Sequence, residues 1–206
     1  MQTPCSPEDT AVPGEGVLLH ICCAACALGA MDALAREGFR VTGFFYNPNI
    51  HPLLEFRRRL KAVKCLRDRL KLDLHCDEQY GLDVFLGAAA GAERKDERCS
   101  RCYRLRLAGA AAKASELGLR LVTTTLFASP HQDVEMVARV GEEAARREGL
   151  EFLVRDFRRH HDEAHAKARA MKLYLQQYCG CIFSEYERYR DTGLHVYKGD
   201  CACPGR

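Results

Sequence analysis

VLLHICCAACALGAMDALAREGFRVTGFF, residues 17–45, is the stretch that decides the fold of this chain. Residues 17–21 form a short apolar run, residues 25–37 have the spacing of an amphipathic helix that stops at Gly38, and residues 40–45 are apolar again. A strand, a helix and a second strand in this order predict a β-α-β unit, whose two strands lie parallel in one sheet.

The same alternation continues along the chain. Because strands that alternate with helices form parallel sheets, we expect an α/β fold with a mainly parallel, doubly wound, Rossmann-like sheet in a single domain. We expect a flexible leader at residues 1–16, a catalytic domain at 17–190 and a flexible tail at 191–206. The expected downstream elements are a basic helix at 52–70, a strand at 72–75, a helix at 82–90, an alanine-rich helix at 99–117, a strand at 119–124, a helix at 132–148, a strand at 151–154 and a helix over about 160–174.

The composition is that of a soluble globular protein. The chain has 206 residues, of which 47% are hydrophobic and 29% are charged, close to the averages of such domains. No apolar run approaches the ~18 to 20 residues that a membrane span needs, and the first residues lack the features of an export signal. We therefore expect a cytoplasmic protein with no membrane partner.

Twelve cysteines point to metal or redox chemistry, because cytoplasmic thiols stay reduced and a disulfide scaffold is not expected. Cys22 and Cys23 follow the first strand, and Cys99 and Cys102 are expected to open the alanine-rich helix. Ligands gather at the carboxyl ends of parallel strands, and a helix N-terminus lowers the pKa of a thiol. Four thiolates that converge there match the ligands of a 4Fe-4S cluster.

A structural zinc site needs the same number of cysteine ligands and stays open as an alternative. The adjacent pair Cys22-Cys23 is unlike the usual spacing of zinc ligands, and Cys26, Cys179 and Cys181 exceed what one closed site uses. Cys179-Gly180-Cys181 forms a second unit. Its thiols can form a strained, reducible disulfide, chelate one metal ion, or be incidental. We interpret Cys65 and Cys76 as ordinary core thiols.

A basic stripe covers residues 57–71, where eight Lys and Arg side chains stand against the single acid Asp68. Such a stripe suits a polyanion such as RNA. The alternative is a solvated helix face, which is the more common meaning of a charge run.

Together the motifs resemble one family, the QueH-type epoxyqueuosine reductases, over about residues 17–189. The resemblance is carried by six stretches that occur in order: LHICCAAC (19–26), YNPNIHP (46–52), ERCSRCYRLR (97–106), TTTL (123–126), DFR (156–158) and YCGCIFS (178–184).

The resemblance implies the last step of queuosine synthesis, in which epoxyqueuosine at the wobble position of tRNA loses its epoxide oxygen without cobalamin. It implies a 4Fe-4S cluster on Cys22, Cys23, Cys99 and Cys102. It also implies that Cys179 and Cys181 act as a redox-active pair or, with or without Cys26, as ligands of a second iron. The expected partners are the tRNAs for aspartate, asparagine, histidine and tyrosine, and an external electron donor.

Further side chains are candidates by type and position. His51 and Tyr103 are candidate proton donors, although either can instead stabilise its surroundings. Tyr46 and Phe56 can stack on a base or pack in the core, and Asn47 and Asn49 can read polar edges of the base or shape the turn around Pro48. The residues expected to contact the substrate or RNA phosphates are Arg57, Arg58, Arg98, Arg104, Arg106, Asp156 and Arg158.

Two other functions remain to be weighed. A tRNA-thiolating enzyme combines an α/β fold with a cluster but needs ATP, and the loop after the first strand carries cysteines where a phosphate loop of the Ser-Gly-Gly-x-Asp-Ser type would lie. A noncatalytic zinc module that binds RNA is the second. It would be colourless, whereas an iron-sulfur protein purified without air is brown.

Overall fold

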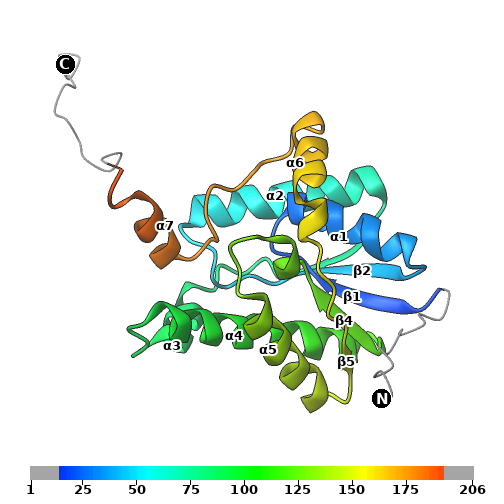
Figure 1. Ribbon diagram of the computed structural model, residues 1–206, viewed down its shortest axis with the longest axis horizontal. Coiled ribbons are helices and arrows are strands. Elements are labelled where there is room, and N and C mark those ends of the chain that lie inside the picture. Colours follow the sequence, from blue (N-terminus) through cyan, green and yellow to red (C-terminus); the bar gives the residue numbers. More distant parts are fainter. Residues whose placement is uncertain (1–13, 193–206) are drawn as a thin grey trace, which may run out of the picture.

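The computed structural model describes residues 14–192 of the chain (Figure 1). Within this part, five parallel strands form one sheet in the order β3-β2-β1-β4-β5. The prediction of a doubly wound α/β fold is confirmed. The strands are β1 (Gly16–His20), β2 (Arg40–Phe45), β3 (Asp73–Cys76), β4 (Leu121–Thr124) and β5 (Glu151–Phe152). The helices are α1 (Ala24–Arg36), α2 (Leu53–Leu70), α3 (Leu82–Ala89), α4 (Lys95–Glu116), α5 (Val134–Arg147), α6 (His161–Ala170) and α7 (Ile182–Tyr189), with 3-10 turns η1 (Thr125–Ala128) and η2 (Arg158–His160).

Helices cover both faces of the sheet. In Figure 1, α1, α2 and α6 lie on one side, and α4 and α5 lie on the other. The chain changes direction between β1 and β4, which are neighbours in the sheet but far apart in sequence. Such a switch point opens a crevice outside the carboxyl ends of the two strands, where ligands of this fold class bind. The loop that carries Cys22 and Cys23 leaves β1 at this point.

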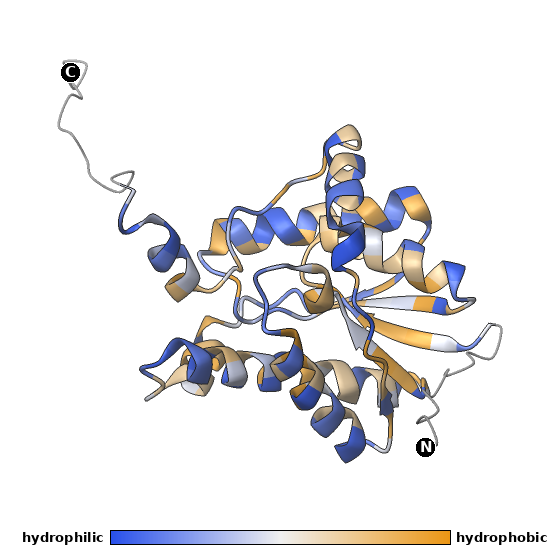
Figure 2. Ribbon diagram, viewed as in Figure 1, coloured by the Kyte–Doolittle hydropathy of each residue, from blue (hydrophilic) through white to orange (hydrophobic). Residues whose placement is uncertain are grey.

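The core lies between the sheet and the two helical layers. Val17, Leu18 and Leu19 of β1 are fully buried, because a central parallel strand is covered on both faces. Figure 2 shows the apolar strands in the middle and polar residues on the outer sides of the helices. Small residues let the layers approach: a side chain at Gly141 of α5 would come within 2.2 Å of the Phe152 ring.

Two expectations about the elements need correction. The helix expected at 99–117 begins at Lys95, so Cys99 and Cys102 lie in its second turn and do not open it. Asp96 and Glu97 in the first turn favour this earlier start, because acids stabilise a helix N-terminus. The helix expected over 160–174 is η2 followed by α6, which ends at Ala170.

Helix α7 was not expected from the sequence. It begins after Cys181, whose sulfur caps it by accepting a hydrogen bond from the Ser184 amide at 3.3 Å. Among the described residues no helix is both long and apolar enough to cross a membrane. The predicted leader and tail fall almost entirely outside the described residues.

Candidate active site

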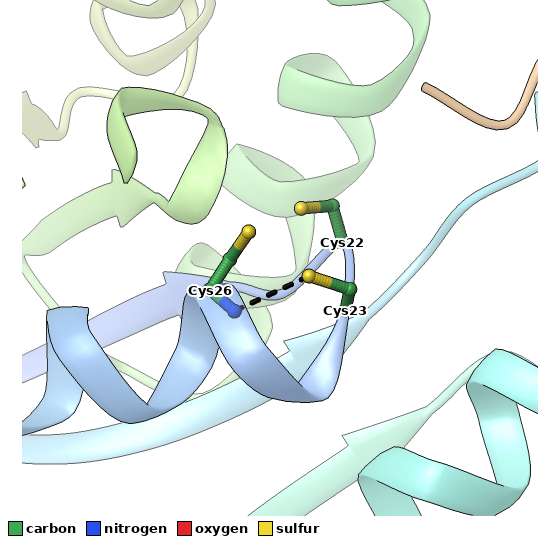
Figure 3. Close-up of side chains that lie close together, drawn as sticks. All are labelled: Cys22, Cys23 and Cys26. Carbon is green, nitrogen blue, oxygen red and sulfur yellow. Dashed lines mark hydrogen bonds between the residues drawn. The ribbon is translucent and has the colours of Figure 1, made fainter. Parts of the chain in front are cut away.

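Three thiols lie together at the switch point. The sulfur atoms of Cys22, Cys23 and Cys26 are all within 4.8 Å of one another (Figure 3). Cys22 lies in the turn after β1, Cys23 caps α1, and Cys26 lies in the first turn of α1. The Cys26 amide donates to the Cys23 sulfur at 3.2 Å, drawn as the dashed line in Figure 3. Three thiols at this separation can bind a soft metal ion or part of a metal cluster.

The arrangement of these three thiols concentrates negative charge on Cys22. Hydrogen bonds from the Cys23 and Cys26 thiols hold the pKa of Cys22 well below its usual range. Arg106 and the Thr125 hydroxyl, 3.1 Å from the sulfur, lower it further. Burial raises the pKa of Cys23 to about 12, and donating to the other two sulfurs raises the pKa of Cys26. A bound metal cation would replace the remaining two protons, since thiolates are the ligands.

A buried polar frame supports this group. His20 at the end of β1 accepts from the Thr124 hydroxyl at 2.8 Å and donates to the Tyr46 carbonyl at 3.0 Å. Burial, with the charge of Arg106, lowers the pKa of His20 to about 3, so its ring is neutral. Asn47 donates to the Ile21 carbonyl at 2.8 Å. These bonds fix the two loops that follow β1 and β2.

Arg106 lies inside the protein and not on its surface. It is 1% exposed, and it donates to the Asn47 side-chain oxygen at 2.8 Å. The thiols of Cys102, Cys22 and Cys179 raise its pKa, so its charge faces both groups of cysteines. A buried guanidinium is stable only beside negative charge or good acceptors. Arg106 is thus buried and not on the outer surface of α4, and its expected contact with substrate or RNA stays a prediction.

A second group of cysteines lies between α4 and the segment before α7. Its members are Cys99, Cys102, Cys179 and Cys181. Cys102 packs with Phe85 and Ala89, and Cys181 packs against the same small cluster. Burial, together with the thiols of Cys179 and Cys181, raises the pKa of Cys99 to about 11 and that of Cys102 to about 12. The helix N-terminus therefore does not make these two thiols acidic, contrary to the sequence-based expectation.

Two glutamines that the sequence analysis missed donate to the cysteines. Gln176 donates to the Cys23 sulfur at 3.0 Å. Gln132 donates to the Cys179 sulfur at 3.7 Å and accepts from the Tyr103 hydroxyl at 2.7 Å. Burial raises the pKa of Tyr103, so its phenol keeps its proton at neutral pH. Neither glutamine lies in a motif with a chemical meaning, and only their spatial position shows their role.

The loop between β2 and α2 lies beside the second group of cysteines. His51 is buried, with its ring 5.1 Å from that of Phe85 and 5.5 Å from that of Tyr80. Burial lowers the pKa of His51, which leaves the imidazole neutral. Asn49 is fully buried, and within residues 14–192 neither atom of its amide has a hydrogen-bond partner. An unmade bond of this kind costs about 1–3 kcal/mol.

The remaining candidates lie on the surface or in the core. Arg57 and Arg58 are exposed on α2, whereas Phe56 is buried and packs against Phe45 and Tyr80. Tyr46 is half-buried and stacks on Phe44. Arg98 pairs with Glu187 of α7, Arg104 pairs with Glu143 of α5, and Asp156 pairs with Arg158 at the start of η2. Cys65 and Cys76 are half-buried against the core.

A doubly wound sheet with grouped thiols and a buried arginine at its switch point is a site that can bind a metal ion or carry out thiol redox chemistry. The family model described as "Epoxyqueuosine reductase QueH" matches residues 17–187. The chain belongs to this family, and the resemblance identified in the sequence is confirmed. The expected function, an oxidoreductase of queuosine synthesis, is confirmed at the level of the family.

Curated relatives agree with this assignment. An epoxyqueuosine reductase QueH of Dehalococcoides mccartyi is 35% identical over 174 residues, which cover 84% of this chain and 94% of the relative. The Thermotoga maritima protein of the same name is 32% identical, with 84% and 91% covered. The Helicobacter pylori protein is 41% identical over 82% of this chain, which spans only 49% of that relative.

Proposed function

We propose that this protein reduces epoxyqueuosine to queuosine at the wobble position of tRNA in the cytoplasm, without cobalamin. The observation that carries the proposal is the grouping of Cys22, Cys23 and Cys26 at the switch point of a chain that belongs to the QueH family. In the reaction both carbon–oxygen bonds of the epoxide break and a carbon–carbon double bond forms. Two electrons from an external donor and two protons are consumed, and the oxygen leaves as water.

The thiols suit a metal cofactor in number and chemistry, and three of them, Cys22, Cys23 and Cys26, have their sulfur atoms within 4.8 Å of one another. Cys22, Cys23, Cys99 and Cys102 would hold a 4Fe-4S cluster, which supplies electrons one at a time. The charge of Arg106 lies near both pairs, which supports their use around one anionic centre. Cys26 contacts Cys22 and Cys23, so it is available either to that centre or to a second iron.

The Cys179–Gly180–Cys181 loop, called the CGC loop below, supplies the second pair of thiols. Its cysteines perturb the pKa values of Cys99 and Cys102, which places them beside α4. Removing an epoxide oxygen needs two electrons, so a redox-active dithiol or a second iron next to a one-electron centre suits the reaction. Gln132 connects this loop to the phenol of Tyr103, which can donate a proton. His51, whose amide contacts the loop, is the second proton donor that we propose. Burial lowers its pKa, so the ring must first take up a proton from solvent before it can pass one on.

The RNA would bind over the N-terminal half of α2 and the exposed side of α4. Arg57 and Arg58 are exposed and can reach phosphates, as can Arg98 and Arg104 once their surface ion pairs exchange. Asn49 is buried in the loop between β2 and α2, and among the described residues its amide has no hydrogen-bond partner, so it has a donor and an acceptor to offer to the modified base. Asp156 and Arg158 are exposed near the end of β5 and remain candidates for substrate contact. The proposed substrates are the tRNAs for aspartate, asparagine, histidine and tyrosine.

The test is reduction of epoxyqueuosine in isolated tRNA by protein purified without air, with a chemical reductant as electron donor. We expect brown protein, iron and sulfide in the protein, and conversion of epoxyqueuosine to queuosine in the nucleosides after digestion. Colourless protein that contains zinc and converts nothing would instead indicate a noncatalytic RNA-binding module. Conversion only in the presence of added cobalamin would contradict the cobalamin-independent reaction.

A further inference from the structure

We propose that Arg59 is a positioning residue for the reaction, and that its guanidinium holds the CGC loop in place. This inference rests on the proposed function, in which Cys179 and Cys181 take part. Arg59 lies within the basic stripe of α2, but it is 2% exposed, whereas the preceding Arg57 and Arg58 are exposed. It is thus unavailable for RNA phosphates, and its buried position needs another explanation.

The guanidinium of Arg59 donates from all three of its nitrogen atoms. Nε donates to the Glu55 carboxylate at 2.7 Å, Nη1 to the Cys179 carbonyl at 2.9 Å, and Nη2 to the Tyr178 carbonyl at 2.8 Å. The group also lies over the Tyr178 ring, 5.7 Å from its centroid. Only arginine offers a planar fork of donors that can reach a carboxylate and two successive carbonyls together.

The next carbonyl of the loop is held as well. The His51 amide donates to the Gly180 carbonyl at 2.7 Å, and the Tyr178 hydroxyl donates to the His51 carbonyl at 2.5 Å. Three successive carbonyls, those of Tyr178, Cys179 and Gly180, therefore accept bonds from α2 and the loop before it. The Glu55 carboxylate also accepts from the Tyr174 hydroxyl, which ties the start of the segment to the same helix.

The backbone of the loop fits closely against the guanidinium. Gly180 has a φ of 126°, and a side chain there would lie 3.2 Å from Nη1 of Arg59 and 3.1 Å from Ile50. With the carbonyls fixed on one side, Cys181 packs against the cluster that contains Cys102 of α4, and the Cys179 sulfur accepts from Gln132. A buried ion pair is a weak source of stability compared with apolar packing. The role of Arg59 is instead to fix the backbone that carries the two thiols, through the bonds to the Tyr178 and Cys179 carbonyls.

The test replaces Arg59 by lysine, which keeps the charge and the pairing with Glu55 but cannot donate to both carbonyls. We expect kcat for epoxyqueuosine in tRNA to fall by about 10- to 100-fold, because a small misplacement of a reacting group has an effect of this size. The KM for tRNA should stay unchanged, because Arg59 does not face the RNA. The matched control is Arg147→Lys, since Arg147 pairs with Glu143 at the same helical spacing but is exposed on α5.

A second readout does not depend on activity. In reduced protein, iodoacetamide should modify exposed Cys179 faster than half-buried Cys181, as followed by mass spectrometry. Arg59→Lys should raise the rate at Cys181 several-fold, and Arg147→Lys should not. Equal Cys181 rates in the wild type and Arg59→Lys would overturn the inference. If wild-type protein fails to reduce epoxyqueuosine, the proposed function fails while this comparison still decides the role of Arg59.

A milder variant covers the case in which Arg59→Lys does not fold. Tyr178→Phe keeps the ring under the guanidinium and removes the hydrogen bond to the His51 carbonyl. We expect it to raise the Cys181 modification rate and lower kcat in the same direction, by smaller factors. A Tyr178→Phe protein that matches the wild type in both measurements would also contradict the inference.

Discussion

At the level of single residues, Cys22 is the most acidic thiol of its group. Its pKa lies well below the usual value because the thiols of Cys23 and Cys26 donate to its sulfur. Arg106 and Thr125 add to the effect. Without metal, the group therefore holds one negative charge, which Cys22 carries, while its two neighbours keep their protons.

Replacing Thr125 by valine tests this distribution of charge. The change removes one donor to the Cys22 sulfur, so the thiolate is less stable and the pKa of Cys22 rises. In metal-free protein, the curve of iodoacetamide reactivity against pH should shift to higher pH, by less than in a Cys23→Ala variant. Thr123→Val is the control, because the Thr123 hydroxyl donates to the Leu153 carbonyl and to no sulfur. A curve that moves equally in both threonine variants would contradict the assignment.

The proposed cluster ligands lead to a second prediction about single residues. Replacing Cys22, Cys23, Cys99 or Cys102 by alanine should remove most of the visible absorption and the bound sulfide, because three thiolates hold a cluster less firmly than four. Cys65→Ala should keep both, since its thiol packs against the core and does not belong to the group of Cys22, Cys23 and Cys26. Full iron and sulfide content in a Cys99→Ala protein would show that the ligand set is wrong.

Residue type alone could not separate the roles of the arginines. Arg57, Arg58 and Arg59 are adjacent in sequence, and only the burial of one face of α2 shows that the third of them holds a loop. The same is true of Arg106 on α4, where only the burial of the side chain distinguishes it from its exposed neighbours. The cysteines could be predicted because thiols in reduced protein have few other uses, whereas Gln132 and Gln176 are common residues whose meaning depends on the sulfur beside them.

At the level of elements, the position of the CGC loop depends on the backbone conformation of Gly180, which has a φ of 126°. Gly180→Ala should destabilise the protein, since a side chain at a φ of 126° costs about 1–3 kcal/mol, and it should also displace the loop from Arg59. Gly149→Ala is the control, because Gly149 also has a positive φ of 70° but has no neighbour within 4 Å among the described residues. Urea unfolding and the rate of epoxyqueuosine reduction measure the two effects. We expect both variants to lose stability and only Gly180→Ala to lose activity; a Gly180→Ala protein with full activity would contradict this.

The sequence predicted the elements around the sheet better than those around the site. The β-α-β unit from residue 17 onward was clear, because a buried parallel strand and an amphipathic helix have different apolar periods. Helix α7 was missed, because its apolar contacts are few and it is held by Arg98, which pairs with Glu187 at 2.5 Å and lies over the Phe183 ring. Contacts of this kind depend on residues far apart in sequence.

At the level of the whole molecule, the exposed basic charges should govern binding to tRNA. Reversing Arg57, Arg58 and Lys61 to glutamate should weaken binding and lower the slope of log affinity against log salt by about 1 for each phosphate that the variant no longer binds. The cluster absorption should stay, because all three side chains are exposed on α2. Arg59 is left out of this set because it is buried. Filter binding at several salt concentrations measures the slope, and an unchanged slope would mean that α2 is only a solvated face.

The N-termini of α1 and α7 are both capped by a cysteine sulfur. Cys23 caps α1 and Cys181 caps α7. Serine and aspartate are the residues that usually cap a helix, and an oxygen in place of either sulfur would make the cap at least as good. Selection for folding alone would therefore let both positions drift to serine. Chains of this lineage that have lost their substrate should show that change early, well before the fold itself decays.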